Sequence, residues 1–213
     1  MINIEDQEAL LKLVAEYLDE DIECVAIGGT AMMFEGYKTA TKDIDLVFSS
    51  LEDRNIFIKA IEKLGYSQKS LKLVYDLKRL QKKNVPLLYS RGDERFDLFV
   101  KDVFGFDIDF KKFIQKHEYI GRKELIIYTV NKELLILLKS ITNREKDYED
   151  IETILSKEKN VDWGNIVDEA ILRRNKISWI LIDLEEKMLQ LKKKTLIKKE
   201  YFDRIYKAEA KAK

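Results

Sequence analysis

The most constraining feature of this 213-residue chain is the stretch GGTAMMFEGYKTATKDIDLVF, residues 28–48. An apolar run precedes its glycine pair, and Asp43-Ile44-Asp45 leads directly into a second apolar run. Short apolar runs bounded by turn residues are typical of buried strands. We therefore predict a strand at 24–28, a turn at Gly28-Gly29, a short helix ending at Gly36, and a second strand at 43–48.

The two aspartates of the second strand indicate a cation site. Residues i and i+2 of a strand point to the same face, so Asp43 and Asp45 project together, roughly 6–7 Å apart at Cα. Adjacent ionised carboxylates repel each other, and a divalent cation such as Mg²⁺ or Mn²⁺ removes that repulsion. Asp97, between Phe96 and Leu98 in another apolar run, would supply a third carboxylate from a neighbouring strand. Three carboxylates can hold the two metals used in phosphoryl displacement.

The glycine pair supplies a complementary element. Glycines after a strand allow the backbone to approach a phosphate closely. Amide groups at the start of the next helix, together with the Thr30 hydroxyl, can then form an anion site. A glycine pair alone is more often only a turn, so the weight of this interpretation comes from the Asp-x-Asp that follows it.

The rest of the chain divides near residue 130. Before it, apolar periodicity predicts helices at 5–19 and 51–65, a helix within 70–83, and strands at 85–89, 95–100 and 124–130. Ser50 is the expected N-cap of the second helix and Gly65 its C-terminal glycine. From Asn131 onward only helical patterns remain. We predict an α/β (α+β) fold, with a mixed sheet flanked by helices over 1–130 and an α-helical region over 131–213.

Composition excludes several kinds of site. Cys24 and His117 are the only residues of their types, which excludes a disulfide framework, a cysteine-based zinc site and a histidine-rich metal site within one chain. The net charge is zero, although residues 187–213 hold ten Lys or Arg against three Asp or Glu. There is no run of 18 apolar residues and the N-terminal segment is acidic, so we expect a cytoplasmic protein with no membrane partner.

This ordered set of motifs resembles the nucleotidyltransferase superfamily with the polymerase-β-like fold. That family carries a Gly-Gly or Gly-Ser turn, a short helix, an Asp-x-Asp, and a later aspartate between apolar residues. Here these would be Gly28-Gly29-Thr30, Asp43-Ile44-Asp45 and Asp97. The resemblance covers residues 22–100.

A narrower resemblance concerns the segment LLILLKSITNREKDYEDI. It is similar to the helical segment of abortive-infection, AbiEii-type nucleotidyltransferases and their archaeal relatives. The positions that match that family's motif are Lys139, Arg144, Lys146, Asp147 and Asp150. On a helix, the first, third and last of these fall within a narrow arc, where a cation could hold a triphosphate and an acid could orient that cation.

The resemblance implies Mg²⁺- or Mn²⁺-dependent transfer of a nucleoside monophosphate from a nucleoside triphosphate, such as ATP, to an acceptor hydroxyl. Asp43, Asp45 and Asp97 would hold the metals. Gly28, Gly29 and Thr30 would cradle the terminal phosphates, and Lys42 or Lys139 would add positive charge. The expected acceptor is an RNA end, such as that of a tRNA, and the protein would be the toxin of a pair with an antitoxin protein.

Other interpretations stay open. The acceptor could be a protein or small-molecule hydroxyl, or the chain could be a catalytically silent nucleotide-binding module. The charged residues at 139–150 could form a plain solvated helix face. Asp107-Ile108-Asp109 repeats the Asp-x-Asp form but lacks a preceding glycine pair, and we interpret it as helix capping. We expect Trp163 and Trp179 to pack within the helical part.

Overall fold

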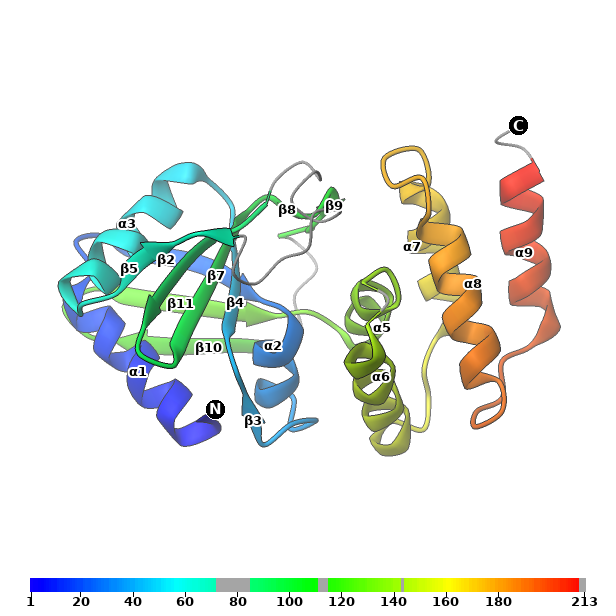
Figure 1. The fold of residues 1–213 in the computed structure, drawn as a ribbon, viewed down its shortest axis with the longest axis horizontal. Coiled ribbons are helices and arrows are strands. Elements are labelled where there is room, and N and C mark those ends of the chain that lie inside the picture. Colours follow the sequence, from blue (N-terminus) through cyan, green and yellow to red (C-terminus); the bar gives the residue numbers. More distant parts are fainter. Residues whose placement is uncertain (72–84, 111–114, 143, 211–213) are drawn as a thin grey trace. The chain divides into compact units, whose positions relative to one another are not determined.

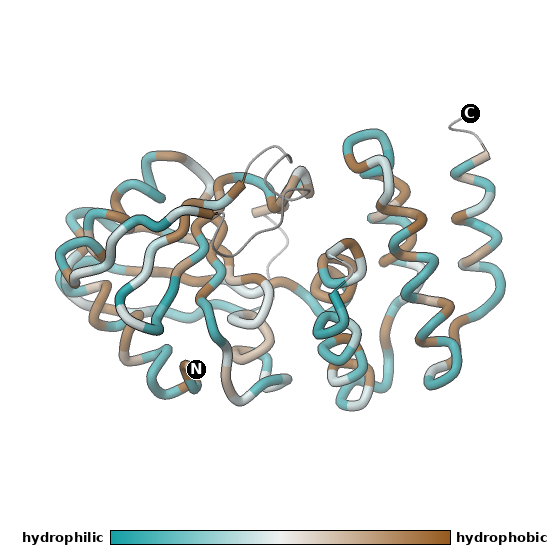
Figure 2. Tube along the Cα trace, in the orientation of Figure 1, coloured by the Kyte–Doolittle hydropathy of each residue, from teal (hydrophilic) through white to brown (hydrophobic). Residues whose placement is uncertain are grey.

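A computed structural model describes residues 1–71, 85–110, 115–142 and 144–210 of the chain. By its contacts the chain divides into two compact units, Met1–Val130 and Asn131–Lys213, whose elements are labelled in Figure 1. Figure 2 shows hydrophobic and hydrophilic residues interspersed along the helices of both units, as expected for helices that bury one side.

The first unit is a mixed sheet with three described helices. The helices are α1 (Ile4–Tyr17), α2 (Gly28–Phe34) and α3 (Leu51–Lys63). The strands are β1 (Ile2–Asn3), β2 (Ile22–Ala26), β3 (Ala40–Thr41), β4 (Ile44–Phe48), β5 (Ser67–Lys69), β6 (Leu87–Arg91), β7 (Glu94–Val100), β8 (Asp102–Val103), β9 (Phe106–Asp107), β10 (Gln115–Ile120) and β11 (Glu124–Thr129).

The main sheet runs in the order β10-β11-β2-β4-β7-β6-β5, with β8 paired to β7 and β9 paired to β8. The pairs β11–β2 and β4–β7 are parallel and the other pairs are antiparallel, so the sheet is mixed as predicted. Separately, β1 pairs with β3 in a two-stranded sheet. Pairing with β1 therefore fixes the position of β3, the strand that precedes Asp43.

Helices α1 and α3 pack side by side on one face of the main sheet. Helix α1 contacts β10 and β11, and α3 contacts β2, β4 and β7. The ring of Phe57 in α3 contacts the rings of Phe48 in β4 and Phe96 in β7. Because successive strand residues point to opposite faces, Asp45 and Asp97 project from the face opposite these helices.

The local signals for these helices are confirmed. The Ser50 hydroxyl accepts a hydrogen bond from the Asp53 amide at 3.0 Å, and Gly65 follows the helix end with φ of +87°. The predicted strands at 43–48, 85–89, 95–100 and 124–130 correspond to β4, β6, β7 and β11. The predicted helix within 70–83 falls almost entirely outside the described residues.

Some expectations for this unit are wrong. Gly28 and Gly29 do not form a separate turn, because they are the first residues of α2. Asp107 lies in β9 and pairs with Asp102. The helix start expected near Asp109 stays a prediction, because residues 111–114 lie outside the described part of the chain. Strand β10 was not predicted. Its side chains alternate between exposed and half-buried, since it lies at the sheet edge, and an edge strand lacks the apolar alternation that marks a half-buried one.

The second unit contains only helices in its described part. They are α5 (Lys132–Ser140), α6 (Glu145–Lys157), α7 (Trp163–Arg173), α8 (Ile180–Leu191) and α9 (Lys199–Ala210). Asn131 caps α5 as predicted, its side-chain oxygen accepting from the Leu134 amide at 2.8 Å. Trp163 is buried as expected, whereas Trp179 is 64% exposed, so the packing role predicted for Trp179 is wrong. Among the described residues, no helix is long and apolar enough to span a membrane.

Candidate active site

Pairing of two neighbouring strands assembles the predicted acidic residues. Asp45 in β4 lies directly beside Asp97 in β7, because these strands pair in parallel with Ile44 opposite Phe96. Asp43 immediately precedes β4, and a side chain of β7, Arg95, contacts the carboxylates of both Asp43 and Asp97. Asp97 is 1% exposed, and Asp43 and Asp45 are half-buried. The structure thus brings together all three carboxylates that the sequence nominates.

A fourth residue, Arg95, joins this cluster without having been predicted. It lies two residues before Asp97 in β7 and therefore points to the same face. Its guanidinium donates to the Asp43 carboxylate through one short hydrogen bond. It also forms an ion pair with Asp97, with 2.9 Å between Nε and Oδ1. In the sequence, the spacing of two between Arg95 and Asp97 indicates that they share a face of the strand. It does not reveal that Asp43 is the second partner of Arg95.

The donor set fits a divalent cation by its chemistry. Carboxylate oxygens are the preferred ligands of Mg²⁺ and Mn²⁺, and the guanidinium of Arg95 shows that this position attracts a cation. In the described part of the chain, no group of three His, Cys, Asp or Glu residues is arranged to hold a metal as it stands. The contact of Arg95 with both Asp43 and Asp97 gives a physical reason, because its guanidinium engages the oxygens that a metal would need.

The glycine pair allows α2 to begin against the acidic cluster. A Cβ atom on Gly28 would lie 2.5 Å from the Asp45 Oδ2 atom, and Gly28 has φ of +58°, a conformation that glycine adopts readily. A Cβ atom on Gly29 would clash with the Thr41 hydroxyl. Close packing against the side chains of Asp45 and Thr41 therefore favours glycine at both positions.

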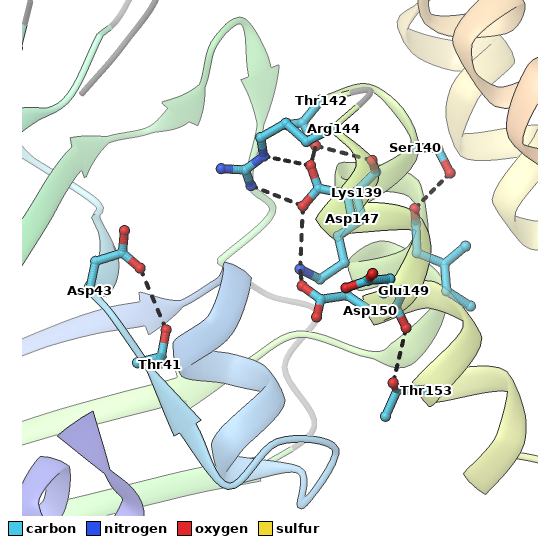
Figure 3. A network of polar contacts seen from close by, with 11 residues as sticks. Thr41, Asp43, Lys139, Ser140, Thr142, Arg144, Asp147, Glu149, Asp150 and Thr153 are labelled. Atoms are coloured by element: carbon cyan, nitrogen blue, oxygen red, sulfur yellow. Dashed lines mark hydrogen bonds and ion pairs between the residues drawn. The ribbon is translucent and has the colours of Figure 1, made fainter. Parts of the chain in front are cut away.

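Thr30 links α2 to the start of β4 through hydrogen bonds. Its buried hydroxyl accepts a hydrogen bond from the Asp45 amide at 2.9 Å and donates to the Asp43 carbonyl at 3.4 Å. The Thr41 hydroxyl donates to the Asp43 carboxylate at 3.5 Å, as drawn in Figure 3. These bonds give Thr30 a positioning role toward both aspartates. Its predicted contact with phosphate stays a prediction, as does that of the exposed Lys42.

Three of the charged residues predicted in the second unit, Lys139, Asp147 and Asp150, form a buried network between α5 and α6, with Arg144 at its edge (Figure 3). Lys139 is 4% exposed, and its Nζ atom lies 2.6 Å from an Asp150 oxygen and 3.7 Å from an Asp147 oxygen. Arg144 donates two hydrogen bonds to Asp147, at 2.6 and 2.9 Å. Lys146 is exposed. The network is therefore more enclosed than the solvated helix face considered from the sequence.

Asp147 stays ionised within this network. Burial opposes its ionisation, but hydrogen bonds from Arg144 and Thr142 and the charges of Arg144 and Lys139 hold its pKa below the ordinary value of 3.8. Because the folded pKa is lowered, the stabilisation is present above about pH 4 and is lost as pH falls through the folded value. The carboxylate thus acts as the fixed counter-charge for two cations.

The family of the chain follows from comparison with known sequences. Residues 4–202 match the family described as "Nucleotidyltransferase of unknown function (DUF6036)". The chain belongs to this nucleotidyltransferase family. No protein of curated function matches it.

Three similar solved structures are distant. The crystal structure of ANT(2'')-Ia in complex with adenylyl-2''-tobramycin is 13% identical, with a TM-score of 0.46 over 86% of this chain and 98% of that chain. JHP933 from Helicobacter pylori is 12% identical, with a TM-score of 0.45 over 99% and 93%. The solution structure of the antibiotic-resistance factor ANT(2'')-Ia is 15% identical, with a TM-score of 0.44 over 87% and 92%. At TM-scores below 0.5 these likenesses carry no argument, and the assignment rests on the family.

The buried network predicts a large cost for removing its central cation. Lys139→Met leaves Asp150 and Asp147 buried without that charge, so we expect a loss of about 3–5 kcal/mol in the free energy of unfolding, measured by urea denaturation. Lys132→Met is the matched control on the same helix. Its half-buried ammonium pairs with Glu158 at 3.3 Å, so the cost should stay below about 1 kcal/mol. Equal costs for the two variants would contradict the enclosed character of the network.

Proposed function

We propose that this protein is a Mg²⁺- or Mn²⁺-dependent nucleotidyltransferase that moves a nucleoside monophosphate from a nucleoside triphosphate to an acceptor hydroxyl. The observation that carries this proposal is the register that sets Asp45 beside Asp97, with Asp43 joined to Asp97 through Arg95. Family membership supports the reaction class. Fold alone does not fix the acceptor.

In the proposed reaction the acceptor oxygen forms a bond to the α-phosphorus, the bond to the bridging oxygen breaks, and pyrophosphate leaves. A divalent cation held by Asp43, Asp45 and Asp97 would neutralise negative charge developing on the α-phosphate. Asp97 would also accept the proton of the acceptor hydroxyl. Gly28 and Gly29 keep the start of α2 close to these carboxylates.

The structural support for a nucleotide contact is weaker for the predicted residues of the second unit than for those of the first. Lys139 is buried, and its charge is met by Asp150 and Asp147, which favours a role in joining α5 to α6. Arg144 keeps a side chain 54% exposed while bonded to Asp147, and Lys146 is exposed as well, so these two can meet a ligand from solvent. A nucleotide contact of Lys139, Arg144, Lys146, Asp147 or Asp150 stays a prediction.

An RNA end is the acceptor class that we propose first. The segment between α8 and α9 and its flanks carry exposed lysines, which favour a polyanion over a small neutral acceptor: Lys192, Lys193, Lys194, Lys198 and Lys199. Two of them are paired, Lys194 with Glu152 and Lys198 with Glu200. The AbiEii-type assignment, the toxin role with its antitoxin, the tRNA end and the cytoplasmic location remain predictions from the sequence.

The test of the proposed function is transfer of α-labelled nucleotide. We would incubate the protein with Mg²⁺, each labelled triphosphate in turn, and total RNA or a cell-protein extract. We expect label in RNA with the unmodified protein, and a loss of at least about 100-fold with Asp45→Asn, which removes a metal ligand at nearly constant shape. Asp109→Asn is the control, because Asp109 belongs to the other Asp-x-Asp and is exposed.

Each outcome of this experiment has a meaning. Label in protein instead of RNA would show that the acceptor is a protein and would still support nucleotidyl transfer. Label in RNA that declines steeply with added salt would support a backbone-binding acceptor site. Equal labelling by Asp45→Asn and the unmodified protein would contradict the role of the acidic cluster. No label in any fraction would favour a small-molecule acceptor or a silent nucleotide-binding module.

The close packing at Gly28 makes a second prediction. Gly28→Ala adds strain at φ of +58° and a contact with the Asp45 carboxylate, so we expect transfer activity to fall at least tenfold. Gly36→Ala is the matched control, because Gly36 has φ of +72° and nothing within 4 Å of the added Cβ atom. Initial rates and thermal unfolding would be measured for both. Similar losses of activity in the two variants would show that backbone strain, rather than the contact with Asp45, is responsible.

A further inference from the structure

Arg95 is the one member of the acidic cluster that the proposed reaction does not use. Its side chain is 22% exposed and lies on the face that carries the aspartates. The guanidinium bonds to the Asp43 carboxylate, forms the 2.9 Å ion pair with Asp97, and has a further NH2 contact with Asp97 Oδ2 at 3.4 Å. One cation thus spans Asp97 in β7 and Asp43, which immediately precedes β4.

The positive charge of Arg95 offsets the repulsion among the carboxylates around it. Asp97 is almost fully buried beside Asp45, and Asp43 lies within reach of the same guanidinium. Carboxylates crowded in this way repel one another and resist ionisation unless a positive charge lies among them. Arginine is well suited to the task, because its planar fork binds two carboxylate oxygens and stays charged.

The contacts of Arg95 with Asp43 and Asp97 oppose the binding of a metal ion by these carboxylates. A cation bound by Asp43 and Asp97 needs the oxygens that the guanidinium now engages, and it would also stand beside a like charge. We propose that Arg95 is an internal counter-ion that competes with the divalent cation for Asp43 and Asp97, so that metal binding requires the guanidinium to leave them. The inference rests on the proposed function and concerns how its metal site is loaded. Arg95 is a positioning residue in this account.

The direct test is Mn²⁺ binding without nucleotide, with Mn²⁺ standing in for Mg²⁺ and free Mn²⁺ measured by electron paramagnetic resonance. We expect Arg95→Gln to bind Mn²⁺ roughly tenfold or more tightly than the unmodified protein, the scale of effect that one neighbouring charge has on a carboxylate equilibrium. Arg95→Lys, which keeps the charge but not the fork, should fall between them. Arg91→Gln is the control, because Arg91 lies on the neighbouring strand and pairs with Glu94 instead.

Thermal unfolding gives a second measurement, which remains informative if Arg95→Gln folds poorly. Without metal, Arg95→Gln should lower the unfolding temperature, and a double-mutant cycle with Asp43→Asn should show coupling between residues 95 and 43. Saturating Mn²⁺ should abolish that coupling, since the metal then replaces the guanidinium. Because Arg95→Lys retains a charge, it provides a second variant for the same measurement.

The outcomes separate this inference from the proposed function. Equal Mn²⁺ affinity in the unmodified protein and Arg95→Gln would overturn the competition and leave the metal site in place. Weaker binding by Arg95→Gln would also overturn it, because Arg95 would then help to assemble the ligands. Absence of Mn²⁺ binding in all variants would overturn both the competition and the metal site.

Discussion

The parallel pairing of β4 with β7 is the constraint on which the rest of the site depends. Its register sets Asp45 beside Asp97, and the period of two along β7 places Arg95 on the face of Asp97. The guanidinium of Arg95 reaches Asp43, which immediately precedes β4. Carboxylates brought so close require a compensating positive charge. Gly28, which allows α2 to begin against Asp45, and the Thr30 hydroxyl, which holds the start of β4, maintain this arrangement.

Much of this could be predicted from the sequence, because it follows from local rules. The Asp-Ile-Asp pattern specifies two carboxylates on one face, and an aspartate inside an apolar strand, Asp97, is hard to explain unless it has a partner. Ser50 and Asn131 carry the helix-capping signal in their own side chains, and both caps are present. These features depend on residues within a few positions of one another, so a single sequence is enough to find them.

The features that were missed depend on contacts between distant segments. Nothing near Arg95 in the sequence identifies Asp43 as its partner, because that contact requires β4 and β7 to be neighbours in the sheet. The role of the glycine pair at the start of α2 depends on Asp45 and Thr41, which lie more than ten residues further along the chain. The amphipathic period around Trp179 indicates a helix but does not decide which side chains it buries.

We propose above all that the acidic face formed by β4 and β7 is the metal and nucleotide site. The most direct measurement is the anomalous scattering of Mn²⁺ in a crystal of the protein grown with Mn²⁺ and a non-hydrolysable nucleoside triphosphate. We predict an anomalous peak within about 2.0–2.4 Å of oxygens of Asp45 and Asp97, with Arg95 turned away from Asp43. A peak only among other acidic residues, such as Asp107 and Asp109, would contradict it.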